Sequence, residues 1–202
     1  MKQIFSAFFA ALFLLAACKG KDGKITHTEK DADGTETTTE VDVKGMQSAT
    51  TEMDKKIEEL KKLTPLTLEE LKALLPEEVN GIKQSNYNSS TMMGYAFAGA
   101  DYKKDENTSM KIALYDCAGE TGSAWYALNY WSKMNFQQES STEYTKTIDF
   151  MGGKAVEQFN KESNHSTLTF SANDRLLIVL SGDNMKPEEL KAAAEKMKFK
   201  IS

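Results

Sequence analysis

The stretch Leu176 to Ser181 restricts the fold more than any other part of this sequence. Its first five residues, LLIVL, are all apolar. A strand that is apolar on both faces has to be covered on both faces, and such strands lie in the interior of a sheet. The sequence therefore predicts a sheet in which this strand is central and buried.

Alternation of apolar residues with polar or small ones predicts further strands after Pro76. Helical patterns occur over residues 123–134 and from Pro187 onward. The fold class expected from this order is α+β: an antiparallel sheet of about six to seven strands with helices packed on it, preceded by a tether and one or two short helices. The expected strands are 82–90, 93–102, 110–115, 142–150, 155–160, 167–172 and 176–181.

Residues 51–77 form a helical lead-in to this domain. Apolar residues recur in it at helical spacing, and the sequence from Thr67 to Glu70 has the pattern of a capping box that opens a second short helix. After Pro76 the period changes from helical to alternating. We therefore expect residues 78–202 to form one globular unit, which is long enough for a core of its own.

Residues 18–50 have the composition of a flexible tether. Thr, Lys, Asp, Glu and Gly dominate this stretch, which buries too little apolar surface to offset the entropy of ordering it. The pair Asp33-Gly34 lies between two runs rich in Thr and Val, and this arrangement is also a signal for a β-hairpin. A tether is the first interpretation, and the hairpin stays open as the alternative.

Residues 1–17 have the order of a bacterial signal peptide. Lys2 is basic, residues 4–15 are almost all apolar, and two small alanines follow. A membrane-spanning helix needs about 20 apolar residues, so this run is too short to serve as a span. Cys18 comes directly after it.

The four residues Leu15-Ala16-Ala17-Cys18 resemble the lipobox of bacterial lipoproteins. The resemblance implies that the sulfur of Cys18 receives a diacylglyceryl group, that the chain is cleaved before this residue, and that the new amino terminus is acylated. Each buried CH₂ contributes about 0.8 kcal/mol, so two or three acyl chains hold a protein on a membrane. Cys18 is therefore the expected lipidation site, and the membrane is an expected partner.

The lipoprotein resemblance also implies a place in the bacterial cell envelope. In enteric bacteria an Asp after the lipidated cysteine keeps such proteins at the inner membrane, and Lys19 occupies that position in this chain. We therefore expect the outer membrane, with the domain on its periplasmic face rather than on the cell surface. The formal charge of −5 provides no clustered basic surface, which excludes nucleic acid as a partner.

The order of elements after residue 78 loosely resembles the extrinsic P-subunit of photosystem II and its bacterial relatives, which pack an antiparallel sheet between helices. The stretch LPEEVNGI, followed by strands rich in small residues, is similar to a group of uncharacterised bacterial exported proteins. Neither resemblance implies an activity, because one fold hosts many functions.

Cys117 is the one thiol of the expected domain, at the end of a strand and before a helix in YDCAGETG. A helix N-terminus can lower the pKa of a thiol, but catalysis also needs a base, and His27 and His165 fall in the tether and in a turn. A buried, unreactive cysteine is the first interpretation. An envelope enzyme with a site near Cys117 and Asp116 is the alternative.

The sequence has no metal-ligand spacing and no phosphate-binding loop, so we expect no metal and no cofactor.

Aromatic residues crowd the segment WYALNYWSKMNF. On a helix Trp125 lies on one face while Tyr126 and Tyr130 lie on another, so both sets enter one core only if the helix is deeply covered. The candidate surface for a protein, a peptide, an apolar ligand or a stacked glycan consists of Trp125, Tyr126, Tyr130 and Trp131. Packing in the core is the first interpretation of these residues, and the candidate surface is the alternative. The expected function is that of a lipid-anchored envelope lipoprotein whose domain binds a partner or supports an assembly without catalysis.

Overall fold

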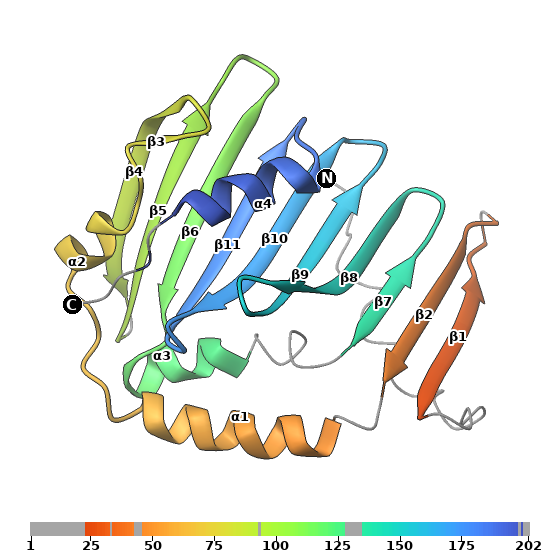
Figure 1. Ribbon diagram of the computed structural model, residues 1–202, viewed down its shortest axis with the longest axis horizontal. Coiled ribbons are helices and arrows are strands. Elements are labelled where there is room, and N and C mark those ends of the chain that lie inside the picture. The colour runs from red at the N-terminus through yellow and green to blue at the C-terminus, as the bar shows by residue number, and fades with distance from the viewer. Residues whose placement is uncertain are drawn as a thin grey trace.

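The computed structural model describes residues 23–32, 34–42, 46–92, 94–127, 135–197 and 199. Within them the chain forms an antiparallel sheet of eleven strands in the order β1-β2-β7-β8-β9-β10-β11-β6-β5-β4-β3, with four helices around it (Figure 1). The strands are β1 (Lys24–Lys30), β2 (Glu36–Asp42), β3 (Glu78–Val79), β4 (Ile82–Met92), β5 (Tyr95–Lys103), β6 (Ser109–Asp116), β7 (Phe136–Glu139), β8 (Glu143–Phe150), β9 (Gly153–Asn160), β10 (His165–Ala172) and β11 (Leu176–Asp183). The helices are α1 (Met46–Leu60), α2 (Leu68–Ala73), α3 (Gly119–Tyr126) and α4 (Pro187–Lys196).

The predicted fold class is wrong. Instead of an α+β fold with about six to seven strands, the chain forms a single, mostly β structure with eleven strands and four short helices. β3 and β7 lie where no strand was expected, and β1 and β2 lie in the segment whose first interpretation was a tether. β3 has two residues and β7 has four, too few for an alternating pattern to stand out. β1 and β2 lie at an edge of the sheet, and their polar sequences lack the apolar face by which a strand is recognised.

β1 and β2 form a hairpin within the residues interpreted as a tether. Their register places Lys24 opposite Asp42 and Lys30 opposite Glu36. β2 also pairs with β7, so the hairpin extends the sheet by two strands. Of the two interpretations of this segment, the structure has the hairpin over residues 24–42.

β11 lies between β10 and β6. Leu176, Ile178 and Leu180 point to one face and have no exposed surface, and Leu177 is buried on the other face. The prediction that LLIVL forms a central, buried strand is therefore confirmed.

One face of the sheet, called the front face below, carries the main hydrophobic core under α2 and α4. Ala96, Ala98 and Ala100 of β5 are buried in this core, and their small side chains allow α2 to approach the strand closely. Leu190 and Ala194 of α4 are buried on the same face. The capping box at the start of α2 and the proline at the start of α4 are as predicted.

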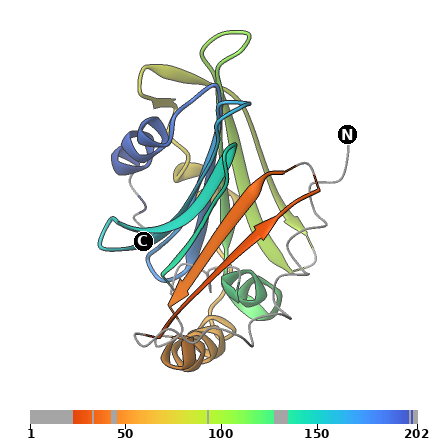
Figure 2. The same ribbon diagram turned by 90° about the vertical axis from the view of Figure 1, so that its right-hand side faces the viewer.

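The opposite face, called the back face, has a smaller core at the end of the sheet where α1 and α3 lie. Met53 and Leu60 of α1 pack there with Cys117, Tyr126 and Leu177. Figure 2 shows α4 and α3 on opposite sides of the sheet, and no described helix over the rest of the back face. In the part of the chain that the structure describes, no helix is both long and apolar enough to span a membrane.

Candidate functional site

Several residues that the sequence analysis singled out lie outside the described residues: Cys18, Tyr130 and Trp131. Trp125 and Tyr126 are described and lie in the last turn of α3. Tyr126 is 3% exposed and belongs to the back-face core, whereas Trp125 is half-buried. Of the two described aromatic candidates, Trp125 is the one at a surface.

Cys117 is buried between β6 and α3. Its side chain has no exposed surface, and burial, with a smaller effect of the neighbouring Asp116, raises the pKa of the thiol to about 12. At neutral pH the sulfur is therefore protonated, and a thiol is a poor nucleophile. These are the surroundings of a packed core residue rather than of a catalytic one.

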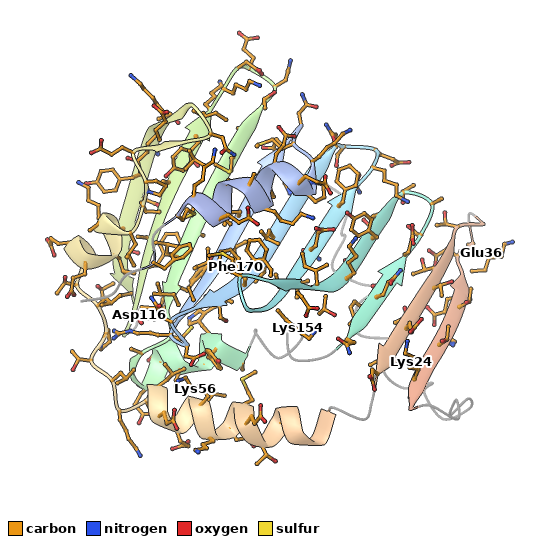
Figure 3. The ribbon with its side chains drawn as sticks, in the orientation of Figure 1. Lys24, Glu36, Lys56, Asp116, Lys154 and Phe170 are labelled. Carbon is orange, nitrogen blue, oxygen red and sulfur yellow. The ribbon has the colours of Figure 1, made fainter. Side chains whose placement is uncertain are left out.

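Asp116 is buried and bound to Arg175 at the end of the sheet beside α3 (Figure 3). Arg175 donates two hydrogen bonds to the carboxylate, from Nε to Oδ1 at 2.7 Å and from Nη2 to Oδ2 at 2.8 Å. The backbone N–H groups of Leu66 and Ala118 donate to the same carboxylate at 2.6 and 3.2 Å. Arg175 Nη2 also donates to the carbonyl of Thr64 at 2.7 Å. The Asp116–Arg175 ion pair and its hydrogen bonds to the backbone, called the clasp below, therefore join the end of β6, the start of β11 and the α1–α2 connection.

His165 lies at the other end of the sheet from Cys117. Asp116, the neighbour of Cys117, is opposite Leu176 at the start of β11, whereas His165 is opposite Asp183 at the end of that strand. Seven steps along a strand at about 3.3 Å each separate the two ends by ~23 Å. His165 therefore cannot act as a base for Cys117 in this structure.

His165 takes part in a different cluster, which has the order of a hydrolase triad. Its Nδ1 lies 2.8 Å from Asp183 Oδ1, and its Nε2 lies 3.2 Å from Ser181 Oγ. Hydrolysis by such a triad also needs backbone N–H donors for the oxyanion. Ser181 lies in β11, which is paired on both sides with β10 and β6, so the N–H groups of this strand are committed to the sheet. We therefore do not assign a catalytic role to the cluster.

Trp125 belongs to an aromatic cluster on the back face. Its ring stacks on Tyr115, with centroids 5.0 Å apart and planes inclined by 18°, and its centroid lies 5.3 Å from that of Tyr95. Phe97 contacts Tyr115 with centroids 5.1 Å apart. All four rings are half-buried. We call Tyr95, Phe97, Tyr115 and Trp125 the aromatic cluster.

Three members of this cluster, Tyr95, Phe97 and Tyr115, were not among the site residues expected from the sequence. Alternation along the strand already places Tyr95 and Phe97 on one face of β5. The position of Tyr115 opposite Phe97 depends on the pairing of β5 with β6, and that of Trp125 over them depends on how α3 packs. The sequence therefore indicates that Tyr95 and Phe97 share one face of a strand. It does not indicate which strand or helix lies next to them.

A row of uncharged polar side chains crosses the back face; its member in β11, Ser181, lies four residues along the strand from Leu177, which is opposite Tyr115 of the cluster. Residues directly opposite each other on neighbouring strands project from the same face. The observed pairing places one residue from each of β2, β7, β8, β9, β10 and β11 in a single row: Thr39, Gln138, Thr145, Gln158, Thr167 and Ser181. At about 4.8 Å between strands the row is ~24 Å long. We call these six residues the polar row.

The surroundings of the polar row differ on its two sides. His27 and Lys111 continue it at its two ends, and the next row away from α3 holds Asp183, His165, Asn160 and Glu143. The next row toward α3 holds apolar, small and hydroxyl side chains, which include Val156, Thr169, Val179 and Ala113. All six members of the polar row are half-buried, and Gln158 Nε2 donates to Thr145 Oγ1 at 3.3 Å. The back face therefore presents hydroxyl and amide groups beside an apolar strip.

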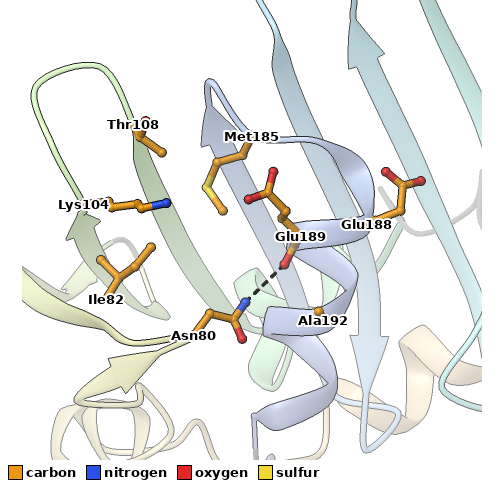
Figure 4. Close-up of a pocket in the computed structure, with 8 residues that line it drawn as sticks. All are labelled: Asn80, Ile82, Lys104, Thr108, Met185, Glu188, Glu189 and Ala192. Atoms are coloured by element: carbon orange, nitrogen blue, oxygen red, sulfur yellow. Dashed lines mark hydrogen bonds between the residues drawn. The ribbon is translucent and has the colours of Figure 1, made fainter.

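A pocket of about 280 Å³ lies on the front face between α4 and the turns at one edge of the sheet (Figure 4). Asn80 Nδ2 donates to the carbonyl of Glu189 at 3.4 Å, and the carboxylate of Glu189 accepts a hydrogen bond from the N–H of Lys186 at 2.9 Å. These polar groups hold α4 in place. We therefore assign no ligand to this pocket.

Among the described residues, no group of three or more His, Cys, Asp or Glu side chains could hold a metal ion. Comparisons with known proteins found no family model, no curated protein and no solved structure that matches this chain. The function therefore has to be inferred from the residues of the chain itself.

Proposed function

We propose that the protein is a lipoprotein of the bacterial cell envelope, anchored through Cys18 at the periplasmic face of the outer membrane. We further propose that its domain is not an enzyme and that it binds an uncharged glycan on the back face. The polar row, together with the aromatic cluster on the same face, carries this proposal.

The chemistry of the back face suits a sugar polymer. Sugar hydroxyl and acetamido groups donate and accept hydrogen bonds, and so do the side chains of Thr, Ser and Gln. Aromatic rings contact the C–H faces of sugar rings, and the aromatic cluster, whose half-buried rings pack on one another, lies at one end of the face. A neutral ligand also avoids a desolvation cost, because it has no charged group that would lose water on binding without gaining a partner of opposite charge.

The residues considered for catalysis support a binding role. The Cys117 thiol is buried and protonated at neutral pH. The Asp116 carboxylate is bound to Arg175 and to two backbone N–H groups. Neither residue is available to a substrate in this arrangement, so we do not propose the enzyme that was the alternative in the sequence analysis.

Gln158→Glu is expected to weaken binding to purified peptidoglycan sacculi about tenfold, which corresponds to about 1.4 kcal/mol. The substitution keeps the shape of a residue in the middle of the polar row but adds a charge that a bound glycan would have to desolvate. Binding is measured by co-sedimentation, and competition with soluble N-acetylglucosamine oligomers separates binding to sugar from binding to the wall peptides.

Gln137→Glu is the matched control for this experiment. Gln137 lies one residue away from the polar row, is exposed, and is opposite Lys146, so it projects from the front face. The control should bind as the wild type does. Wild-type protein that is not retained by sacculi, or equal losses in the two variants, would contradict the proposed ligand face.

Cys18→Ala is expected to abolish lipidation, because the acyl group is transferred to the cysteine sulfur. The variant should move from the membrane fraction to the soluble fraction, since each buried CH₂ of the lost acyl chains contributed about 0.8 kcal/mol to membrane binding. Detergent phase partitioning and the intact mass of the protein measure the effect. An unchanged distribution between the phases would rule out Cys18 as the anchor.

A further inference from the structure

We infer that the β1–β2 hairpin is the membrane-proximal part of the mature protein. The short connection of residues 19–23, called the leash below, keeps the Lys24 end of β1 close to the lipid headgroups. This inference rests on the proposed lipidation of Cys18. Its partner is the surface of the lipid bilayer that holds the anchor.

The length of the leash follows from where the sheet begins. Residues 19–23 separate Cys18 from Lys24, the first residue of β1. Six steps of extended chain at about 3.6 Å each allow a reach of at most ~22 Å. A free tether over the 32 residues 19–50 would instead span ~30 Å on average and more than ~100 Å when extended. The hairpin therefore removes most of the freedom that the sequence suggested.

The hairpin is continuous with the rest of the sheet, so the leash restrains the whole domain. β2 pairs with β7 from Thr38 to Val41, and the N–H of Asp42 donates to the carbonyl of Asn135 at 3.1 Å. Within the hairpin, Lys24 and Glu40 form an ion pair with an N–O distance of 2.8 Å. Whatever holds Lys24 close to a bilayer therefore holds one edge of the sheet there too.

The attachment point and the charge distinguish the two ends of the hairpin. The leash joins β1 at Lys24, which forms an ion pair with Glu40 and lies opposite Asp42, whereas the turn end reads EKDADGTE, with four acidic residues and one lysine. Anionic lipid repels the acidic end. Figure 3 places Lys24 at the end of the hairpin nearest α1 and Glu36 at the opposite end. The end of the sheet with α1 is therefore the one nearer the membrane.

The other side of the sheet lies well away from the leash. β1 is the first strand and β6 the eighth in the order of the sheet. Seven spacings of about 4.8 Å separate them by ~34 Å. Asn107, in the turn between β5 and β6, is exposed, and so is Thr26 in β1. These two positions can report on opposite sides of the molecule.

A fluorescence-quenching experiment tests the inference on the lipidated full-length protein. Thr26→Cys and Asn107→Cys, each made in a Cys117→Ser background, are labelled with a small fluorophore after the protein is placed in vesicles of phosphatidylethanolamine and phosphatidylglycerol. A spin label on the lipid headgroup is expected to quench the probe at Thr26 several-fold more than the probe at Asn107. Inserting about 20 Gly and Ser residues after Gly20, enough to add ~25 Å on average, should abolish the difference while the protein stays on the vesicles.

The outcomes separate this inference from the lipid anchor. If the protein floats with vesicles but both probes are quenched equally, or if the longer leash changes nothing, the membrane-proximal hairpin is wrong and the anchor stands. If the protein does not float with vesicles at all, the anchor itself is wrong, and the inference falls with it.

Discussion

Arg175→Met is expected to lower the free energy of unfolding by about 3 to 5 kcal/mol, the usual cost of removing one partner of a buried ion pair. Asp116 has no exposed surface and the Arg175 side chain is 15% exposed, so the carboxylate that is left cannot turn toward water. The hydrogen bond from Arg175 to the carbonyl of Thr64 is lost as well. Urea unfolding followed by tryptophan fluorescence measures the effect.

Lys56→Met is the control for the clasp. Lys56 of α1 lies 3.8 Å from Asp174, which immediately precedes Arg175, and the Asp174 side chain is 77% exposed. Exposed ion pairs contribute about 0 to 1 kcal/mol, so this variant should unfold almost as the wild type does.

Combining Asp116→Asn with Arg175→Met should lower the free energy of unfolding by less than the sum of the two single changes. A loss below about 1 kcal/mol for Arg175→Met would show that the clasp contributes little.

Glu157→Gln is expected to lower the free energy of unfolding by about 2 to 3 kcal/mol at neutral pH. The Glu157 side chain is 1% exposed and binds Lys146 at 3.1 Å, Lys191 at 2.9 Å and the hydroxyl of Tyr144 at 2.8 Å. Lys191 belongs to α4, so the carboxylate ties this helix to β8 and β9. The cost stays below that of Arg175→Met because both lysine side chains are partly exposed and can turn toward water.

The effect of Glu157→Gln should shrink as the pH falls. Burial raises the pKa of this carboxyl, but hydrogen bonds from Lys191, Tyr144 and Lys146 outweigh burial and hold the pKa below its ordinary value of 4.5. A carboxylate with a lowered pKa in the folded state stabilises the protein above its unfolded pKa, and this contribution is lost as the pH falls through the folded pKa. Wild type and variant should therefore converge in free energy of unfolding as the pH falls below 4.5 and through the lowered folded-state pKa.

Glu188→Gln is the control for that comparison. Glu188 is a second carboxylate near Lys191, at 3.6 Å, but its side chain is 72% exposed. Its removal should change the free energy of unfolding by less than about 1 kcal/mol at any pH. A difference between Glu157→Gln and wild type that persists unchanged in acid would mean that charge is not the reason for the loss.

The candidate site was partly predictable. Trp125 could be identified because its helical spacing separates it from the face of Tyr126. Thr145, Thr167 and Gln158 were not predicted as site residues, because a single hydroxyl or amide residue on a strand does not by itself indicate a binding site. They become one feature only through the pairing of β8, β9 and β10, which brings together residues from three strands. Sequence periodicity describes which face of a strand a residue occupies, but not which strand lies beside it.

The identity of Cys117 as a packed residue was likewise decided by tertiary contacts. A thiol between a strand end and a helix is compatible with a lowered or a raised pKa. Met53 and Leu60 of α1 pack in the same small core, and burial raises the pKa of the thiol. No local pattern around residue 117 shows that α1, more than fifty residues earlier, covers it.

By itself the sequence determined the elements whose signals are local. The apolar run LLIVL predicted a buried central strand, the capping box from Thr67 to Glu70 predicted the start of α2, and Pro187 predicted the start of α4. Each depends on neighbouring residues alone. Only the tertiary structure decided the size of the sheet, because β3 and β7 are too short to be recognised as strands, and the hairpin signal over β1 and β2 does not show that this hairpin joins the main sheet. The pairing of β2 with β7 joins residues almost one hundred positions apart, and such pairing leaves little trace in either segment.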